Sequence, residues 1–221
     1  MNIGQRYSHG YGHQNRSQSA PLKGKIYRME EDEEETIEDG EEVKVIDNNI
    51  YFYCPVSMNS ILELTLSIKK LTTQLIMMQV QFGSCFDPNI NLYINSEGGD
   101  VVAMLGIVDI ILNNKVPVYT IITGHACSAA SILSIIGAKR YIAPNSYMLI
   151  HNISSTFWGK AHEFEDEMKN INKLTSNLKK LYSTYGDIPK TKLEALLKKD
   201  LYLDAKTSCK LGFVDEIGFP E

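Results

Sequence analysis

The chain has 221 residues and a formal net charge of −5. Residues 30–42 hold ten acidic residues, so the charges of all other residues sum to about +5. An excess this small predicts no extended basic surface for nucleic acid. Its length fits one α/β domain with a tail. No apolar run reaches the roughly 20 residues that a bilayer span needs, and the four cysteines show neither a CxxC pair nor metal-ligand spacing, so we expect no membrane span, disulfide framework or structural zinc.

The first 43 residues are expected to form a disordered tail, and residues 44–221 to form the folded domain. Residues 1–28 are polar and hold no acidic residue, and the acidic run that follows repels itself and buries too little to offset its ordering entropy. His9 and His13 in this tail are interpreted as solvated. Reduced cysteines and the missing span predict a cytoplasmic protein, with an organelle such as a plastid, or the host cytosol for a viral protein, as the alternative.

Strands and helices alternate along the expected domain. Two β-rich stretches flank an Asn-Asn turn in VKVIDNNIYFYCPVS, and residues 60–82 then place apolar side chains at helical spacing. The segments NINLYIN and VPVYTIIT predict strands on either side of a helix at 101–112. The second of these strands is apolar or β-branched throughout, which is typical of a parallel sheet.

The second half of the domain begins with a predicted helix at 128–136. KRYIA and YMLIH then predict two short strands around the turn PNS, and a long amphipathic helix covers 161–182. Two shorter helices are predicted in PKTKLEALLKK and DAKTSCKLG. Strands and helices in series favour an α/β fold with right-handed βαβ crossovers.

The segment GHACSAAS, residues 124–131, lies where an apolar strand gives way to an apolar helix. Ser128 is expected at the helix N-terminus, where free backbone N–H groups favour a developing oxyanion. The residues alone leave two roles open for it, a nucleophile and an N-cap. Cys127 competes as a nucleophile, although the residue before a helix start commonly turns into the core. Ser131 and Ser134 are expected to pack as small residues.

A serine nucleophile needs a base, and three histidines lie in the predicted domain. His125 is too close to Ser128 along the chain to aim at its oxygen, and His162 lies near the exposed start of the long helix. His151 ends the strand YMLIH, at the rim of the sheet, where catalytic groups of open α/β folds gather. The residues alone also leave a structural role open for His151.

The glycine pair Gly98–Gly99 follows a strand and precedes a helix, so its backbone can approach a ligand and present an N–H group. Together with the N–H of Ala129 it would form an oxyanion hole with two donors, although a tight turn also explains two adjacent glycines. The chain has neither GxGxxG nor GxxxxGK[ST], so no nucleotide is predicted, and we expect no cofactor and no metal.

Four segments in this order, INLYINSEGGD, GHACSAAS, PNSYMLIHN and KKDLYLDAKTSCKLGFVDEI, resemble the proteolytic subunit of the Clp protease, the S14 family of serine peptidases. Ser128 follows Gly99 by 29 residues, close to the family's spacing, and the resemblance covers about residues 45–218. It implies the family's fold, a ClpP/crotonase-like α/β superhelix of repeated β-β-α units with a projecting handle helix.

The resemblance also implies site residues. Ser128 would be the nucleophile, His151 the general base, and Asp200, in KKDLYLDA, the acid that holds the imidazole tautomer. The backbone amides of Gly99 and Ala129 would bind the oxyanion. Without the resemblance, Asp200 is one of several acids of the same region, which include Asp187, Asp204 and Asp215.

By the same resemblance the chain would hydrolyse peptide bonds of unfolded proteins or peptides inside a chamber of stacked homo-oligomeric rings. The residues ahead of Asp47 differ from the family's pore-loop segment, which counts against docking to an AAA+ unfoldase. After His151, NISSTFWGKA replaces the family's Gly-rich groove strand, and GAKRYIAPNS is two residues shorter than usual. Such divergence suits a viral or plastid member.

Three other functions fit parts of the pattern. A catalytically inactive Clp-like assembly or adaptor subunit would keep the fold and lose the groove. A crotonase-type acyl-CoA enzyme uses a similar pair of backbone donors, but the Ser-His-Asp set in the peptidase order counts against it. A membrane-linked Ser-Lys peptidase is disfavoured by the matching histidine and by the lack of a span.

Overall fold

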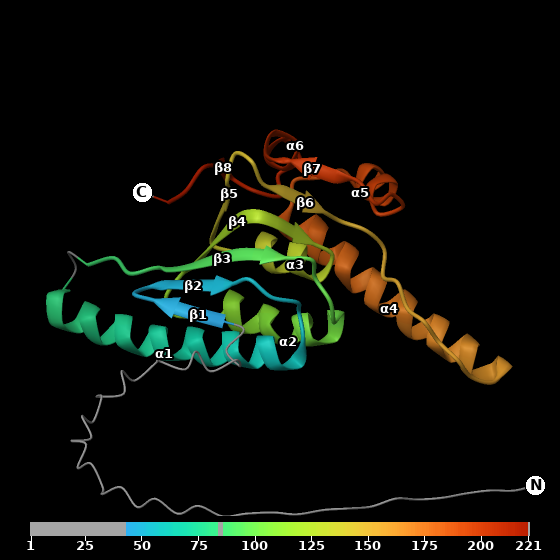
Figure 1. Ribbon diagram of the computed structural model, residues 1–221, viewed down its shortest axis with the longest axis horizontal. Helices are drawn as coiled ribbons and strands as arrows, with labels where there is room; N and C mark the ends of the chain where they lie inside the picture. Colours follow the sequence, from blue (N-terminus) through green and yellow to red (C-terminus); the bar gives the residue numbers. More distant parts are fainter. Residues whose placement is uncertain (1–42, 84–85, 221) are drawn as a thin grey trace, which may run out of the picture. The chain divides into compact units, whose positions relative to one another are not determined.

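The computed structural model describes residues 43–83 and 86–220, which form an α/β fold with helices α1, α2 and α3 layered on one face of a sheet (Figure 1). The elements are, in chain order, β1 (Val43–Ile46), β2 (Asn49–Phe52), α1 (Met58–Phe82), β3 (Ile90–Ser96), α2 (Val101–Leu112), β4 (Val118–Cys127), α3 (Ala129–Ile135), β5 (Lys139–Ile142), β6 (Tyr147–Leu149), α4 (Ala161–Tyr185), α5 (Lys190–Leu196), β7 (Tyr202–Asp204), α6 (Ala205–Lys210) and β8 (Glu216–Ile217).

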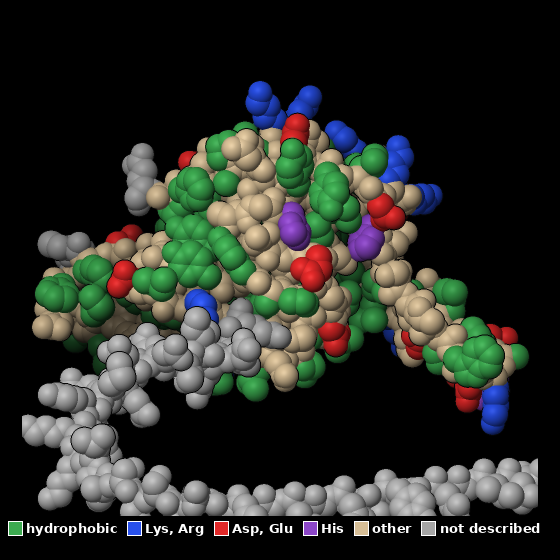
Figure 2. Space-filling model, viewed as in Figure 1, with side chains coloured by type: hydrophobic (Ala, Val, Ile, Leu, Met, Phe, Trp, Pro, Cys, Tyr) green, Lys and Arg blue, Asp and Glu red, His purple; other side chains and the backbone are tan. Residues whose placement is uncertain are grey.

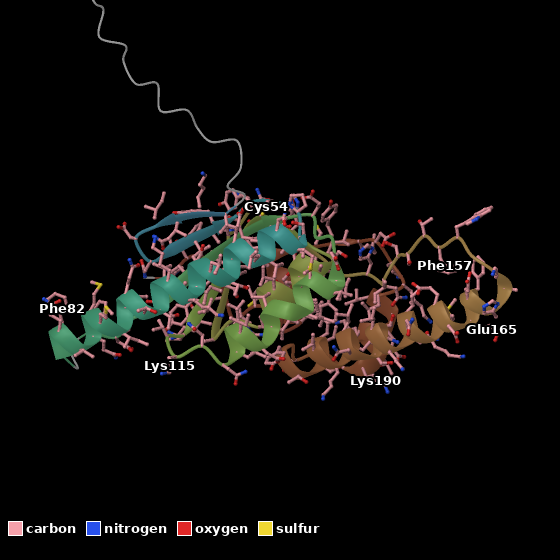
Figure 3. All side chains as sticks on the ribbon, turned by 90° about the horizontal axis from the view of Figure 1, so that it is seen from below. Cys54, Phe82, Lys115, Phe157, Glu165 and Lys190 are labelled. Carbon is pink, nitrogen blue, oxygen red and sulfur yellow. The ribbon has the colours of Figure 1, made fainter. Side chains whose placement is uncertain are left out.

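The sheet has the strand order β1-β2-β3-β4-β5-β8, and β6 joins it by pairing with β4 and β7. β1 is antiparallel to β2, whereas the pairs β2–β3, β3–β4 and β4–β5 are parallel. Alternate residues of β3 are buried, as the two-residue period of a strand requires when one face meets the core. Ile90 and Leu92 share this core with Leu64 and Ile68 of α1, and Figure 3 shows α1 and α2 side by side in the helical layer.

Polar caps fix where the first two helices begin. The Ser57 hydroxyl accepts the Ser60 N–H (3.0 Å), and the Ser60 hydroxyl accepts the Ser57 N–H (2.9 Å), a capping box that starts α1 two residues before the predicted helix. Asp100 accepts the N–H groups of Val102 (2.7 Å) and Ala103 (3.1 Å), so α2 begins immediately after the glycine pair. The cap thereby fixes the turn between β3 and α2.

Strand β4 runs four residues beyond the predicted strand and ends at Cys127. It does so because it changes partner along its length. Residues 119–122 pair with β5, whereas His125 and Cys127 pair with Tyr147 and Leu149 of β6. The end of β4 therefore lies against the short strand that leads to His151.

Helix α4 projects away from the sheet (Figure 1). Its buried residues, Leu178 and Tyr182, both lie in its C-terminal part. Toward the other end its large apolar side chains, such as Phe164 and Met168, are exposed. The predicted handle helix and the predicted fold class are confirmed.

Some sequence expectations need correction or lie outside the description. The first hairpin turns at Asp47–Asn48 rather than at an Asn-Asn pair, with Asp47 at a φ of 54°. β7 and β8 were not predicted, because strands of two or three residues carry no periodic signal. The predicted tail, with its two histidines, lies outside the described residues except for Val43, which opens β1. Among the described helices, none is both long and apolar enough to cross a bilayer.

Candidate active site

Ser128 stands between β4 and α3 in a backbone conformation that is rare for residues with a side chain. Its φ is 53° and its ψ is −122°. Such a conformation costs on the order of 1–3 kcal/mol and persists only where the surroundings enforce it. Ser128 occupies the N-cap position, but its hydroxyl caps no backbone N–H, so the N-cap interpretation of this side chain is wrong. The hydroxyl is left for another role, on a residue that is only partly buried.

The register of three strands brings His151 opposite Asp200, 49 residues further along the chain. Leu149 of β6 pairs with Cys127 of β4 on one side and with Tyr202 of antiparallel β7 on the other. His151 lies two residues after Leu149, and Asp200 lies two residues before Tyr202. The His151 Nδ1 is 3.1 Å from an Asp200 carboxylate oxygen. The pairing therefore fixes an imidazole and a carboxylate as neighbours.

The end of β6 also holds the candidate nucleophile. The Ser128 N–H donates to the carbonyl of Leu149 at 2.9 Å, two residues from His151. The Asn152 N–H donates to the Leu197 carbonyl at 2.9 Å, which ties the chain beyond His151 to the end of α5. The described residues contain no hydrogen bond between the Ser128 hydroxyl and the His151 ring. Catalytic hydrogen bonds often form only once substrate is bound, so this geometry leaves the contact open.

Solvent reaches the acid more than the base. The His151 side chain is 28% exposed and the Asp200 carboxylate is 78% exposed, so water screens their attraction. On the face shown in Figure 2, histidine side chains lie near acidic ones at the surface, among hydrophobic and neutral polar groups. An exposed pair of this kind orients a ring more than it stabilises the fold.

The glycine pair lies directly beside Ser128. A Cβ on Gly98, whose φ is +93°, would meet the Ser128 Cβ at 2.8 Å and the Ala129 nitrogen at 3.0 Å. Gly99 forms a parallel bridge with Val56, in which the Val56 N–H donates to the Gly98 carbonyl and the Asp100 N–H donates to the Val56 carbonyl, both at 2.8 Å. The bridge uses the carbonyl of Gly98 and the N–H of Asp100, so the N–H of Gly99 itself points away from Val56.

Two amides near Ser128 donate no hydrogen bond to any described residue. Ala129 is the first residue of α3, so its N–H has no intrahelical acceptor. Within the part of the chain that the structure describes, neither this N–H nor that of Gly99 donates a hydrogen bond. Sequence reasoning had singled out both positions. It had missed Val56, because nothing in the sequence marks it as the residue that holds the glycine turn.

The other predicted candidates have different surroundings. His125 is on β4, where its backbone N–H donates to the Asn95 side chain at 3.2 Å. His162 is exposed near the start of α4. Among the alternative acids, Asp204 caps α6 by accepting the Thr207 N–H (2.7 Å). The pKa of Asp204 is lowered, first by a hydrogen bond with the Thr207 side chain and then by this bond to its N–H. Asp215 is paired with the Arg140 guanidinium.

Cys127 is a core thiol. Its side chain is buried, and this burial, together with the charge of Glu97, raises the pKa of the thiol to about 11. A thiolate is the reactive form of cysteine, so this environment suppresses nucleophilic attack. The prediction that Cys127 turns into the core is confirmed.

We expect Cys127 to resist iodoacetamide at pH 8 in the folded protein. Because its pKa is raised, the thiolate fraction at that pH is about one in a thousand, and it should grow about tenfold per pH unit toward pH 11. Mass spectrometry of the modified peptide measures this, with the same chain unfolded in urea as the control that reacts freely. Rapid alkylation of folded protein at pH 8 would show that the thiol is not held in the core.

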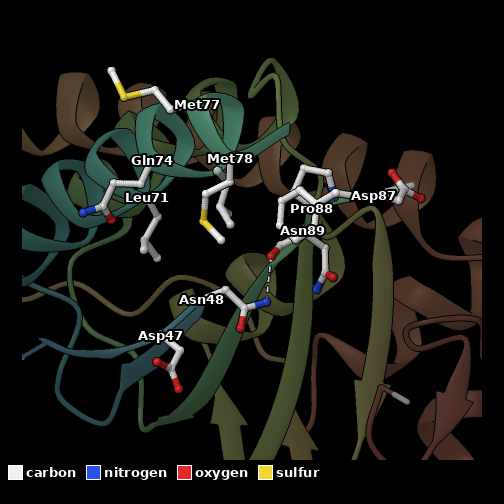
Figure 4. Close-up of a pocket in the computed structure, with 11 residues that line it drawn as sticks. Asp47, Asn48, Leu71, Gln74, Met77, Met78, Asp87, Pro88 and Asn89 are labelled. Carbon is white, nitrogen blue, oxygen red and sulfur yellow. Dashed lines mark hydrogen bonds between the residues drawn. The ribbon is translucent and has the colours of Figure 1, made fainter. Parts of the chain in front are cut away.

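A large hollow in the described structure lies away from these residues. It encloses about 680 Å³ beside the C-terminal half of α1, between the hairpin turn at Asp47 and the segment that includes Phe86 and Pro88 (Figure 4). Met77 and Met78 contribute to its lining. Its lining contains none of the predicted site residues.

Comparisons with known proteins identify a family. Residues 47–221 match the family described as Clp protease. The chain is 35% identical over 133 residues to a protein of Deinococcus radiodurans named ATP-dependent Clp protease proteolytic subunit. That match covers 59% of this chain and 65% of the relative, so the chain spans slightly less than two thirds of the relative's length.

Proposed function

This chain belongs to the Clp protease family, and from that premise we propose that it is a serine endopeptidase whose triad is Ser128, His151 and Asp200. The observation that carries the proposal is the alignment of β4, β6 and β7, which sets the His151 ring 3.1 Å from Asp200 and ties Ser128 to the same strand end. The peptidase domain would comprise residues 44–221, with residues 1–43 as a tail outside it.

The proposed chemistry follows from which nitrogen faces the acid. Because Nδ1 of His151 faces the Asp200 carboxylate, Nδ1 carries the proton and Nε2 is left as the base. Nε2 takes the proton of the Ser128 hydroxyl as its oxygen attacks the peptide carbonyl. The imidazolium then returns this proton to the leaving amine, and an activated water hydrolyses the acyl-enzyme by the same route. The amides of Gly99 and Ala129 would stabilise the oxyanion of each tetrahedral intermediate.

The substrate and assembly belong to the proposal as well. The substrate would be an unfolded protein or peptide, cut inside a chamber of stacked homo-oligomeric rings in the cytoplasm. Exposed apolar side chains on and before α4 support such packing: Trp158 is 98% exposed, and Phe157 meets Phe164 edge-on with ring centroids 5.1 Å apart. Figure 3 shows Phe157 and Glu165 toward the outer end of α4. An AAA+ unfoldase would be a further partner, to be tested separately.

Two observations favour a second candidate, a catalytically inactive assembly or adaptor subunit. The Ser128 hydroxyl has no hydrogen bond to His151 among the described residues, and the acid is largely exposed. Cleavage by the wild-type protein that depends on Ser128 would exclude this candidate.

We expect the purified protein to cleave casein carrying self-quenched dyes, since an unfolded substrate exposes peptide bonds next to every kind of side chain. Fractions from size exclusion should show this activity in a species several times larger than one chain. Light scattering on the same fractions gives the mass. Activity that elutes only at the mass of a single chain would contradict the proposed chamber, and inactivity of every fraction would contradict the proposed peptidase.

A further inference from the structure

A buried chain of hydroxyl groups links the handle helix to the backbone of Ser128. The Tyr182 hydroxyl, on α4, lies 2.6 Å from the Ser131 hydroxyl on α3. The Ser131 hydroxyl in turn lies 2.6 Å from the carbonyl oxygen of Ser128. Tyr182 is 1% exposed and Ser131 is fully buried, so water does not compete for these contacts. The sequence prediction that Ser131 only packs as a small residue is therefore incomplete.

The protons in this chain can be assigned. A carbonyl oxygen only accepts, so the bond between Ser131 and Ser128 uses the single hydroxyl proton of Ser131. Ser131 is then the acceptor toward Tyr182, which must donate its phenol proton. Burial raises the pKa of Tyr182 well above its ordinary value, so the phenol keeps that proton. The relay runs from Tyr182 to Ser131 to the Ser128 carbonyl.

The Ser128 carbonyl belongs to the peptide unit that also carries the Ala129 N–H. It accepts two hydrogen bonds from Ser131, one from the N–H at 3.0 Å and one from the hydroxyl. In a planar trans peptide the C=O and the N–H point in opposite directions. Fixing the carbonyl toward the core therefore aims the Ala129 N–H away from it, and a tilt of this plane would move both groups together.

We propose that Tyr182 and Ser131 are positioning residues that hold the Ser128–Ala129 peptide so that the Ala129 amide faces the oxyanion. This inference rests on the proposed function, because it assigns a role within the same site. The strained φ of Ser128 explains why such support is needed, since a residue at +53° relaxes unless its neighbours enforce that angle. The relay reaches Ser128 from α4, where Tyr182 lies 51 residues beyond Ser131.

Packing alone does not require the Tyr182 hydroxyl. The ring of Tyr182 meets Phe213 edge-on, with centroids 6.0 Å apart, and a phenylalanine ring would make the same contact. A buried hydroxyl is costly unless it is paired, so its presence here is accounted for by its bond to Ser131. Tyr182→Phe thus removes the donor and leaves the ring packing in place.

The test is the rate at which a fluorophosphonate inactivates the protein. In Tyr182→Phe and in Ser131→Ala we expect the maximal inactivation rate to fall about tenfold. The fluorophosphonate concentration that gives half of this rate should not change, because the misdirected Ala129 amide affects the transition state and not the binding of the probe. The double variant should be no slower than Ser131→Ala alone, since both changes break one relay. Rates are normalised to the reactive fraction, so loss of folded protein does not mimic the effect.

Tyr185→Phe is the matched control. Tyr185 lies on the same helix and packs on the same core, but the hydrogen bond that the structure gives it uses its main-chain oxygen, which accepts from Arg140. Its variant should react at the wild-type rate. Wild-type reactivity of both Tyr182→Phe and Ser131→Ala would overturn the positioning role while leaving the peptidase intact. A wild-type protein that does not react at all would overturn the proposed function, and the positioning role with it.

Discussion

Ser128→Ala is expected to lower casein cleavage by about 10³-fold or more, because removal of a nucleophile leaves only substrate binding and oxyanion stabilisation. The fold should survive this change. The Ser128 hydroxyl caps no backbone N–H, and the three hydrogen bonds that anchor the residue use its N–H once and its carbonyl twice. Initial rates with the dye-labelled casein, compared at equal folded concentration, give the ratio.

Ser128→Gly provides the matched control for strain. Glycine adopts positive φ without the penalty that a Cβ incurs. The unfolding free energy of this variant should therefore exceed that of Ser128→Ala by about 1 kcal/mol, and its urea midpoint should be higher. Both variants should be equally inactive, because both lack the hydroxyl. Any difference in stability between them then comes from the backbone conformation at this position. Cleavage that persists in either variant would remove Ser128 from the role of nucleophile.

Gly98→Ala is expected to destabilise the protein by about 2–5 kcal/mol, from the positive φ and from overpacking together. The new Cβ would lie 2.5 Å from the Cys127 carbonyl oxygen and 2.8 Å from the Ser128 Cβ, and both neighbours are held by the strand end and the helix start. Whatever folds should show little cleavage, because relief of the clash moves Ser128. Urea denaturation and casein cleavage measure the two effects.

Gly106→Ala is the control for a glycine of the same region. Gly106 lies within α2, and an added Cβ there would meet nothing within 4 Å. Alanine should instead raise the unfolding free energy by about 0.5–1 kcal/mol, since it has the better helix propensity, and cleavage should stay at the wild-type rate. Similar losses in both glycine variants would contradict the close contact between Gly98 and Ser128.

Local patterns in the sequence were sufficient for most elements of the fold. The apolar face of α1 and the alternation in β3 follow the periods that burial imposes on a helix and a strand. The segment that became β4 is instead apolar or β-branched throughout, as is typical of a strand inside a parallel sheet. The position of Ser128 at a strand-to-helix junction followed from the same patterns. Its positive φ did not, because a non-glycine residue carries no sequence signal for a strained backbone.

The convergence of distant residues could not be derived from those patterns. Asp200 looked like Asp204 and Asp215 until the structure gave the latter two a helix cap and an arginine partner. Only the resemblance to the Clp protease family had singled it out. Likewise, nothing periodic links Ser131 to Tyr182, since their contact depends on how α4 packs against α3.

Reaction of the wild-type protein with a fluorophosphonate, followed by mass spectrometry of its peptides, tests the central claim most directly. A serine whose proton is taken by a neighbouring imidazole attacks phosphorus, whereas an ordinary serine hydroxyl does not. The triad proposal predicts a single adduct on each chain of the assembled protein, located on Ser128. An assembled and folded protein with no adduct, or with its adduct on another residue, would contradict it.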